Sequence, residues 1–331
     1  MLRSRISPLV CCFLLVLVTT APAAPGDYTF QTIDLPFQGA AFPTLVWPVA
    51  VTDALTFAGD ASVPGGLGFR IAQTLNLTPV RCPDFARYPF SDRRGPEVVG
   101  MNIAGVVALN FEGLENQCGG VQTPDGTCTF TLVEGSVGTR YTGISDAGVV
   151  VGHYWTDAAG PELGLLRFHG FFQDSSGVHR LDGPTPNDIV FPTGINSHGI
   201  MIGTMLRNVQ PDNAAAAEQA FFRTPDGVYH DVAGPDGEVV TLTGLNDNGQ
   251  AVGTFTAAAG GQQAFVFDTT TETLTILPRP TADTVELLPT AINNGGDIVG
   301  AYVEGTPEFP QFSVYGFLAL PTGRAILEVT K

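Results

Sequence analysis

The chain has 331 residues, a formal net charge of −17 at pH 7, and only 14% charged residues. So large a negative charge repels phosphate backbones and anionic lipid surfaces, which excludes nucleic acid as an expected partner. The 40 Gly, 25 Pro and 22 Phe residues suit a protein of many short strands and turns.

The first 23 residues have the three parts of a secretory signal peptide. Arg3 and Arg5 form a basic start, and an apolar core runs from Leu9 to Val18. Ala21–Ala23 then provides a small-x-small cleavage site, so the mature chain is expected to begin at Ala24. The apolar core is roughly half the length of a bilayer-spanning helix. We therefore expect secretion to the periplasm or the extracellular space, with no membrane span.

Residues 24–331 contain a segment that recurs six times. Its clearest copy, Thr243–Phe255, is a short strand, an Asn-Asp-Asn-Gly turn and a second strand. The turn position of the copies falls at residues 55, 105, 148, 199, 249 and 296. Asn and Asp bond their own backbone in tight turns and Gly accepts a positive φ, so we interpret the segment as a hairpin. The acidic spacing of a calcium loop is absent.

A second pair of strands follows in each well-matched unit. It begins at a phenylalanine-containing segment, which recurs at His169–Phe172, Gln219–Phe222, Gln263–Val266 and Tyr315–Leu318. A turn such as Thr224–Gly227 and a fourth strand complete a unit of about 50 residues. Four strands at this period predict an all-β fold, a β-propeller of six four-stranded blades in one repeat domain, 24–331. The alternative is an open β-solenoid of stacked hairpins.

The ends of the mature chain predict how the ring closes. Thr29–Pro36 resembles the fourth strand of a unit. Together the two ends hold more residues than one unit needs. We expect this segment to join the last blade.

The long, dissimilar connections are expected on one face of the propeller. They run through residues 81–97, 154–167, 205–218 and 303–314. Binding sites usually lie on variable loops of a rigid scaffold. The opposite face, with the Asn-Gly turns, is therefore expected to be less involved in binding. His153, Tyr154 and Trp155 adjoin the variable face and are the predicted ligand-binding residues, because aromatic rings stack on a sugar or a peptide.

Three cysteines, Cys82, Cys118 and Cys128, follow the signal peptide. An exported protein is expected to pair some of them. Cys118 and Cys128 flank a hairpin turn at residues 123–126 and are the favoured pair, while a pair with Cys82 stays open. Three scattered cysteines without a histidine at ligand spacing do not predict a metal site.

No motif of catalysis is present. The sequence has no His-Glu-x-x-His, no Gly-x-Ser-x-Gly elbow and no glycine-rich loop that opens a helix. We predict no catalytic residue, metal or cofactor. The predicted function is that of an exported, monomeric scaffold that binds a glycan or a protein on its variable face. The alternative is a propeller hydrolase or lyase acting on an extracellular polysaccharide, which rests on fold analogy.

The pattern Gly-Ile-Asn-x-x-Gly-x-x-x-Gly, as in Gly194–Gly203, is followed by triplets similar to His-Ala-Phe. The triplets are His169–Phe171, Gln219–Phe221, Gln263–Phe265 and Tyr315–Phe317. This combination resembles the bacterial extracellular HAF repeats. The resemblance implies export and repetition, and it supplies no catalytic residues.

Overall fold

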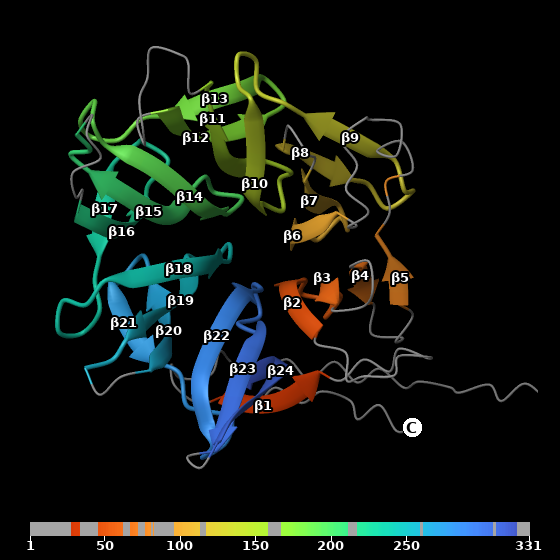
Figure 1. The fold of residues 1–331 in the computed structure, drawn as a ribbon, viewed down its shortest axis with the longest axis vertical. Helices are drawn as coiled ribbons and strands as arrows, with labels where there is room; N and C mark the ends of the chain where they lie inside the picture. The colour runs from red at the N-terminus through yellow and green to blue at the C-terminus, as the bar shows by residue number, and fades with distance from the viewer. Residues whose placement is uncertain are drawn as a thin grey trace, which may run out of the picture.

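A computed structural model describes residues 28–33, 46–61, 67–71, 77–80, 82, 96–112, 117–157, 167–210, 217–258, 261–306 and 309–322. These residues form an all-β ring of six four-stranded blades around a central channel (Figure 1). The predicted propeller is confirmed, and the open solenoid is wrong. The predicted signal peptide, 1–23, lies outside the described residues.

The blades follow one another along the chain. Blade 1 contains β2 (Val46–Val51), β3 (Phe57–Ala61), β4 (Leu67–Ile71) and β5 (Leu77–Pro79). Blade 2 contains β6 (Glu97–Met101), β7 (Val107–Glu112), β8 (Gln117–Gln122) and β9 (Cys128–Thr131). Blade 3 contains β10 (Gly138–Ile144), β11 (Val150–Trp155), β12 (Phe168–Asp174) and β13 (Gly177–Leu181). Blade 4 contains β14 (Ile189–Ile195), β15 (Met201–Arg207), β16 (Ala217–Arg223) and β17 (Tyr229–Val232). Blade 5 contains β18 (Val240–Leu245), β19 (Gln250–Thr256), β20 (Gln262–Asp268) and β21 (Thr273–Ile276). Blade 6 contains β22 (Thr284–Ile292), β23 (Ile298–Thr306), β24 (Phe309–Pro321) and β1 (Tyr28–Ile33).

The N-terminal strand β1 closes the ring. It pairs antiparallel with β24, from Tyr28 opposite Pro321 to Ile33 opposite Gly316, and forms the outermost strand of blade 6. The ring of Phe30 lies 5.5 Å from that of Phe317. The first described strand of the chain thus completes its last blade, as the sequence predicts.

The first hairpin has the same geometry in every blade. The innermost strand carries a bulge in all six, and the six predicted turn positions all have a positive φ, namely Leu55, Gly105, Gly148, Gly199, Gly249 and Gly296. Five of these positions are glycine because only glycine adopts this conformation without steric cost. Leu55 in blade 1 is the exception, and it is one of the residues in which that copy departs from the repeat pattern.

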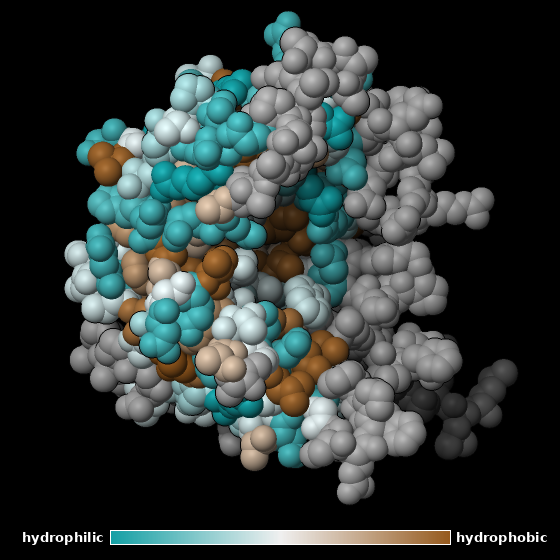
Figure 2. Space-filling view, turned by 60° about the vertical axis from the view of Figure 1, so that its left-hand side comes forward, coloured by the Kyte–Doolittle hydropathy of each residue, from teal (hydrophilic) through white to brown (hydrophobic). Residues whose placement is uncertain are grey.

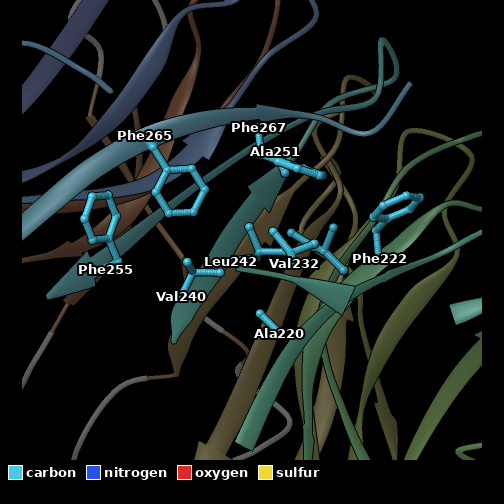
Figure 3. Packing of buried hydrophobic residues seen from close by; sticks show 10 residues of the cluster. Ala220, Phe222, Val232, Val240, Leu242, Ala251, Phe255, Phe265 and Phe267 are labelled. Carbon is cyan, nitrogen blue, oxygen red and sulfur yellow. The ribbon is translucent and has the colours of Figure 1, made fainter. Parts of the chain in front are cut away.

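Hydrophobic side chains pack between neighbouring blades. The phenylalanines of the triplets are buried, each exposed by 1% or less: Phe171, Phe221, Phe265 and Phe317. Between blades 4 and 5, Phe265 and Leu242 meet Ala220 and Val232 (Figure 3). In the view of Figure 2, the upper part of the coloured surface is mostly hydrophilic, and hydrophobic residues gather near the middle. Burial of apolar area between blades is therefore the main stabilising contribution.

One disulfide links blade 1 to blade 2. It joins Cys82 to Cys128, with a Cα–Cα distance of 5.7 Å, and Cys118 is a free thiol whose pKa is raised by burial. The predicted Cys118–Cys128 pair is wrong. Cys128 lies opposite Gln122 of β8. Cys118 is four positions from Gln122 on the same strand, so it lies about 13 Å from the position opposite Cys128.

No described segment forms a helix of the length and apolarity that crossing a bilayer requires.

Candidate functional site

The innermost strands define two ends of the central channel. Each runs toward the turn of the first hairpin, so one end of the channel is ringed by these turns and is called the turn end. The starts of the same strands ring the opposite opening, called the loop end. Trp155, where one of the predicted variable connections begins, lies opposite the start of β10 and so at the loop end, while most residues of these connections lie outside the described part of the chain.

The turn end encloses a cavity of about 100 Å³, lined by the innermost strands and turns of all six blades. The first residue of each turn bonds its own backbone, because its side-chain oxygen accepts the amide N–H four residues later. This holds in all six copies, at Thr52, Asn102, Ser145, Asn196, Asn246 and Asn293. The predicted turn role of these side chains is therefore correct.

The same turns also bond one another across the blades. Asn196 Nδ2 donates to the carbonyl of Asn246 at 3.1 Å, and Asn246 Nδ2 donates to that of Asn293 at 2.8 Å. Asn293 Nδ2 donates to the carbonyl of Thr52 at 3.0 Å, which links the last blade to the first. The sequence interpretation missed these bonds, which connect blades 4, 5, 6 and 1.

The second turn residue adds further bonds between blades in four of the six copies, with Asp53, Asp146, Asp247 and Asn294 as acceptors. The Asp247 carboxylate accepts the N–H of Ser197 at 2.7 Å, and Asp53 accepts that of Asn294 at 2.8 Å. Burial raises the pKa of Asp146, with Asp247 and Asp53 adding to the effect and the Ile103 N–H bond opposing it. Among the described residues, no three His, Cys, Asp or Glu side chains are grouped to hold a metal ion. We interpret the turn end as structural.

Replacing Asn246 by alanine is expected to lower the free energy of unfolding by about 2–3 kcal/mol, because several buried bonds are lost at once. Asn248→Ala is the matched control in the same turn. Asn248 is exposed and makes a single bond, to the carbonyl of Asn294, so its loss is expected to stay below about 1 kcal/mol. Urea unfolding of both variants measures the difference, and equal losses would contradict a stabilising role for the bonds between these blades.

At the loop end the blades stop resembling one another. Five residues before the first turn residue, blades 1 to 6 carry Trp47, Glu97, Arg140, Phe191, Thr241 and Leu288. Eight residues after it, they carry Asp60, Asn110, His153, Thr204, Thr254 and Ala301. The two positions are paired across the first hairpin of each blade. Blades 5 and 6 show that small or aliphatic residues satisfy the scaffold there, so the ionisable residues of blades 1–3 are not required by the fold.

These ionisable residues form a charged arc, defined here as Asp60, Glu97, Arg140 and His153. Arg140 Nη2 donates to Glu97 Oε2 at 2.5 Å, and the two side chains are 29% and 43% exposed. Asn110 Nδ2 also approaches the same Glu97 oxygen at 3.4 Å. The Glu97–Arg140 pair thus bridges blades 2 and 3 and remains accessible from the loop end.

Asp60 occupies in blade 1 the place that Asn110 occupies in blade 2. Asn110 bonds both backbone groups of Tyr141, with its Oδ1 accepting the N–H at 2.8 Å and its Nδ2 donating to the carbonyl at 3.0 Å. Asp60 Oδ1 accepts the N–H of Val98 at 3.4 Å. Burial raises the pKa of Asp60 to about 7, opposed by the Val98 bond and reinforced by Glu97. A protonated Asp60 can donate as the amide of Asn110 does, so the neutral form suits the site.

The contribution of Asp60 to the stability of the protein is therefore expected to fall as the pH rises from 4 to 7. A folded-state pKa near 7, above the ordinary value of 3.8, makes ionisation of Asp60 costly only in the folded state. The cost is absent below pH 3.8, grows up to about pH 7 and is constant above it. Asp60→Asn is expected to stabilise the protein by roughly 2–4 kcal/mol at pH 8 and little at pH 4. The reverse exchange, Asn110→Asp, should introduce a similar penalty, and urea unfolding at both pH values tests the pair.

His153 faces a cluster of aromatic rings between blades 3 and 4. Its ring lies 5.5 Å from Phe191 and 6.2 Å from Trp155, and Trp155 lies 6.0 Å from Phe168. Burial, with the Arg140 guanidinium adding to it, lowers the pKa of His153 to about 4, so the imidazole is neutral at pH 7. His153 Nδ1 is buried without a hydrogen-bond partner among the described residues.

The structure brings together two of the three predicted ligand-binding residues. His153 and Trp155 share one face of β11, because side chains alternate along a strand. Tyr154 lies on the other face, 5.0 Å from the ring of His169 and 6.2 Å from that of Phe171, and belongs to the core. Sequence reasoning missed Asp60, Glu97, Arg140 and Phe191. Comparing the copies at fixed distances from the turn would have found them.

A Ser-His-Asp group in the outer turn of blade 3 is not a catalytic triad. Ser176 Oγ and Asp174 Oδ1 lie 2.8 and 3.1 Å from the same atom, His179 Nε2. A triad needs the two partners on different imidazole nitrogens. We interpret the group as a turn-stabilising cluster.

Comparison with known proteins supports the fold. No known family matches the chain, and no curated protein matches it in sequence. The chain is similar in structure to TolB from Acinetobacter baumannii, with 12% identity, a TM-score of 0.50, and coverage of 83% of this chain and 63% of that one. It therefore spans less than two thirds of that protein. It is also similar to a protein assigned as TolB from Agrobacterium tumefaciens, with 12% identity, a TM-score of 0.51, and coverage of 76% and 88%. At this identity the likeness shows the β-propeller fold alone.

Proposed function

We propose that the protein binds an extracellular ligand, a glycan or a protein, at the loop end of its channel without transforming it. One observation carries the proposal. Six copies of one scaffold supply an internal control, and the paired positions at the loop end carry small or aliphatic residues in blades 5 and 6 but ionisable residues in blades 1–3. Side chains that the scaffold does not need, gathered at one opening, are the expected mark of a binding site.

The proposal includes secretion and kinship with the HAF repeats. Arg3, Arg5 and the apolar segment Leu9–Val18 support export, and the repeated Gly-Ile-Asn pattern supports the kinship. Mass spectrometry of the exported protein tests the first point. An N-terminus at Ala24 is the expected result, and retention of the whole segment would contradict it.

The binding proposal is tested by comparing the loop-end positions of blades 2 and 3 with those of blade 5. The mature chain is screened on arrays of neutral and acidic oligosaccharides and of peptides. Glu97→Gln with Arg140→Gln is expected to abolish the signal, because it removes the accessible ion pair. The matched control, Thr241→Ala with Thr254→Ala, changes the paired loop-end positions of blade 5 and should leave the signal intact. Equal signals from both double variants would overturn the loop-end site.

Polysaccharide hydrolysis or elimination is a second candidate, favoured by one observation. Asp60, with a pKa of about 7, lies beside Glu97, and a carboxylic acid still protonated near neutral pH is suited to general acid catalysis. Release of reducing or unsaturated ends from polysaccharides, lost in Asp60→Asn and Glu97→Gln, would establish it. Unchanged polymers bound by the protein would exclude it.

A further inference from the structure

We propose that the loop end holds a subsite for one neutral pyranose ring of a glycan, with Trp155 as its stacking face and the Glu97–Arg140 pair as the partner of its hydroxyls. The inference rests on the proposed binding function and names its ligand class.

The aromatic cluster of Trp155, Phe168, Phe191 and His153 differs from the triplet phenylalanines that pack between the blades. Its members come from β11, β12 and β14, and Phe168 and Phe191 lie 6.3 Å apart. All four side chains are only partly buried, whereas the triplet phenylalanines are fully buried. Aromatic surface left partly open at a channel mouth is typical of a ligand site.

Trp155 is held in a fixed place by the neighbouring strand. It lies opposite Gly138 of β10, and a Cβ added at Gly138 would lie 2.0 Å from the indole. The indole therefore occupies the space of the missing side chain and packs against the backbone of β10. Arg167 lies over Phe168, 5.3 Å from the ring centre, and covers that ring. A stacking surface that is already ordered costs little entropy on binding.

Arg140 lies two residues from Gly138 on β10, and its pairing with Glu97 fits hydroxyls better than ions. Arg140 and Glu97 neutralise each other and still place donors and acceptors side by side, which matches neighbouring hydroxyls that both donate and accept. The neutral His153 adds no charge beside the ion pair. A chain with a net charge of −17 repels uronates, so a neutral sugar is favoured over an acidic one.

The test is titration of the mature chain with neutral hexasaccharides of glucose, mannose or galactose, and with uronate oligosaccharides of the same length. Isothermal titration calorimetry gives Kd, and saturation-transfer NMR identifies the sugar protons in contact with the protein. Binding of a neutral hexasaccharide is expected. Trp155→Ala should weaken it at least about tenfold, since a central aromatic anchor is lost. Gly138→Leu should weaken it similarly by displacing the indole, and Tyr154→Phe, on the opposite face of β11, should leave Kd unchanged.

The outcomes separate this inference from the proposed function. Binding of uronates alone, or a Kd that depends on Glu97 and Arg140 but not on Trp155, overturns the pyranose subsite and leaves loop-end binding standing. Binding of peptides alone does the same. Absence of any binding overturns both. Circular dichroism and thermal melting of each variant confirm that a loss of affinity is not a loss of fold.

Discussion

Gly253→Ala is expected to lower the free energy of unfolding by more than about 4 kcal/mol, placing it among the exceptional single substitutions. A Cβ at this position would lie 2.1 Å from the carbonyl oxygen of Thr241 in the neighbouring strand, and 2.9 Å from the ring of Phe265. The closer obstacle is backbone, so no side-chain rotation relieves it. The innermost strand and its neighbour would have to move apart, and the packing against blade 4 would open with them.

The same close approach recurs around the ring. At the equivalent positions, Gly59, Gly152, Gly203 and Gly300, an added Cβ would lie 2.1–2.3 Å from a carbonyl oxygen of the innermost strand. Blade 2 carries Leu109 there instead, buried in the cluster between blades 1 and 2. Five of six blades thus meet the requirement with glycine.

The matched control for Gly253→Ala is Gly148→Ala. Gly148 has a φ of +79°, but nothing lies within 4 Å of its added Cβ. Its cost is conformational alone, on the order of 1–2 kcal/mol. Urea unfolding followed by tryptophan fluorescence compares the two variants. A Gly253→Ala protein as stable as Gly148→Ala would show that the inner strands separate readily.

Removing the Cys82–Cys128 disulfide is expected to cost about 4 kcal/mol, the chain-entropy value for a link across 46 residues. The link fastens the end of blade 1 to the outermost strand of blade 2, so it restricts the unfolded chain over a whole blade. Cys82→Ser with Cys128→Ser should lower the urea midpoint to that of the reduced wild type. Cys118→Ser is the control and is expected to change stability by less than about 1 kcal/mol, because the thiol forms no disulfide.

Peptide mapping without reduction checks the connectivity. The wild type should yield a Cys82–Cys128 cross-linked peptide. A cross-link between Cys118 and Cys128 in the wild type, or a Cys118→Ser variant as destabilised as the double variant, would contradict the structure.

Most of the fold can be predicted from the sequence repeat, but only part of the candidate site can. The fixed spacing of the repeat predicts the six turns, the phenylalanine core and the closing strand. Each of these follows from a short sequence pattern and from the number of residues in a unit. The disulfide partner depends on strand register and on the fold of the segment around Cys82, and neither is visible in cysteine spacing. Tyr154 was grouped with His153 and Trp155 by adjacency, although strand alternation separates neighbours.

The bonding between blades and the charged arc were missed for a different reason. Asp247, two residues before Gly249, satisfies the pattern of a turn acid, and only the neighbouring blade reveals that its carboxylate accepts the Ser197 N–H. Glu97 and Arg140 stand 43 residues apart, and their contact follows only when successive copies are laid side by side.

The pairing of β1 with β24 sets the order in which the protein can become stable. Tyr28 is among the first described residues to be synthesised, and its partner Pro321 is among the last. The earlier blades can form while the chain is being synthesised. One edge of β24 stays unpaired until β1, at the other end of the chain, pairs with it. Contacts of such long sequence separation are slow to form. We therefore expect a late, rate-limiting step in refolding, when the two ends of the chain meet and lock the ring.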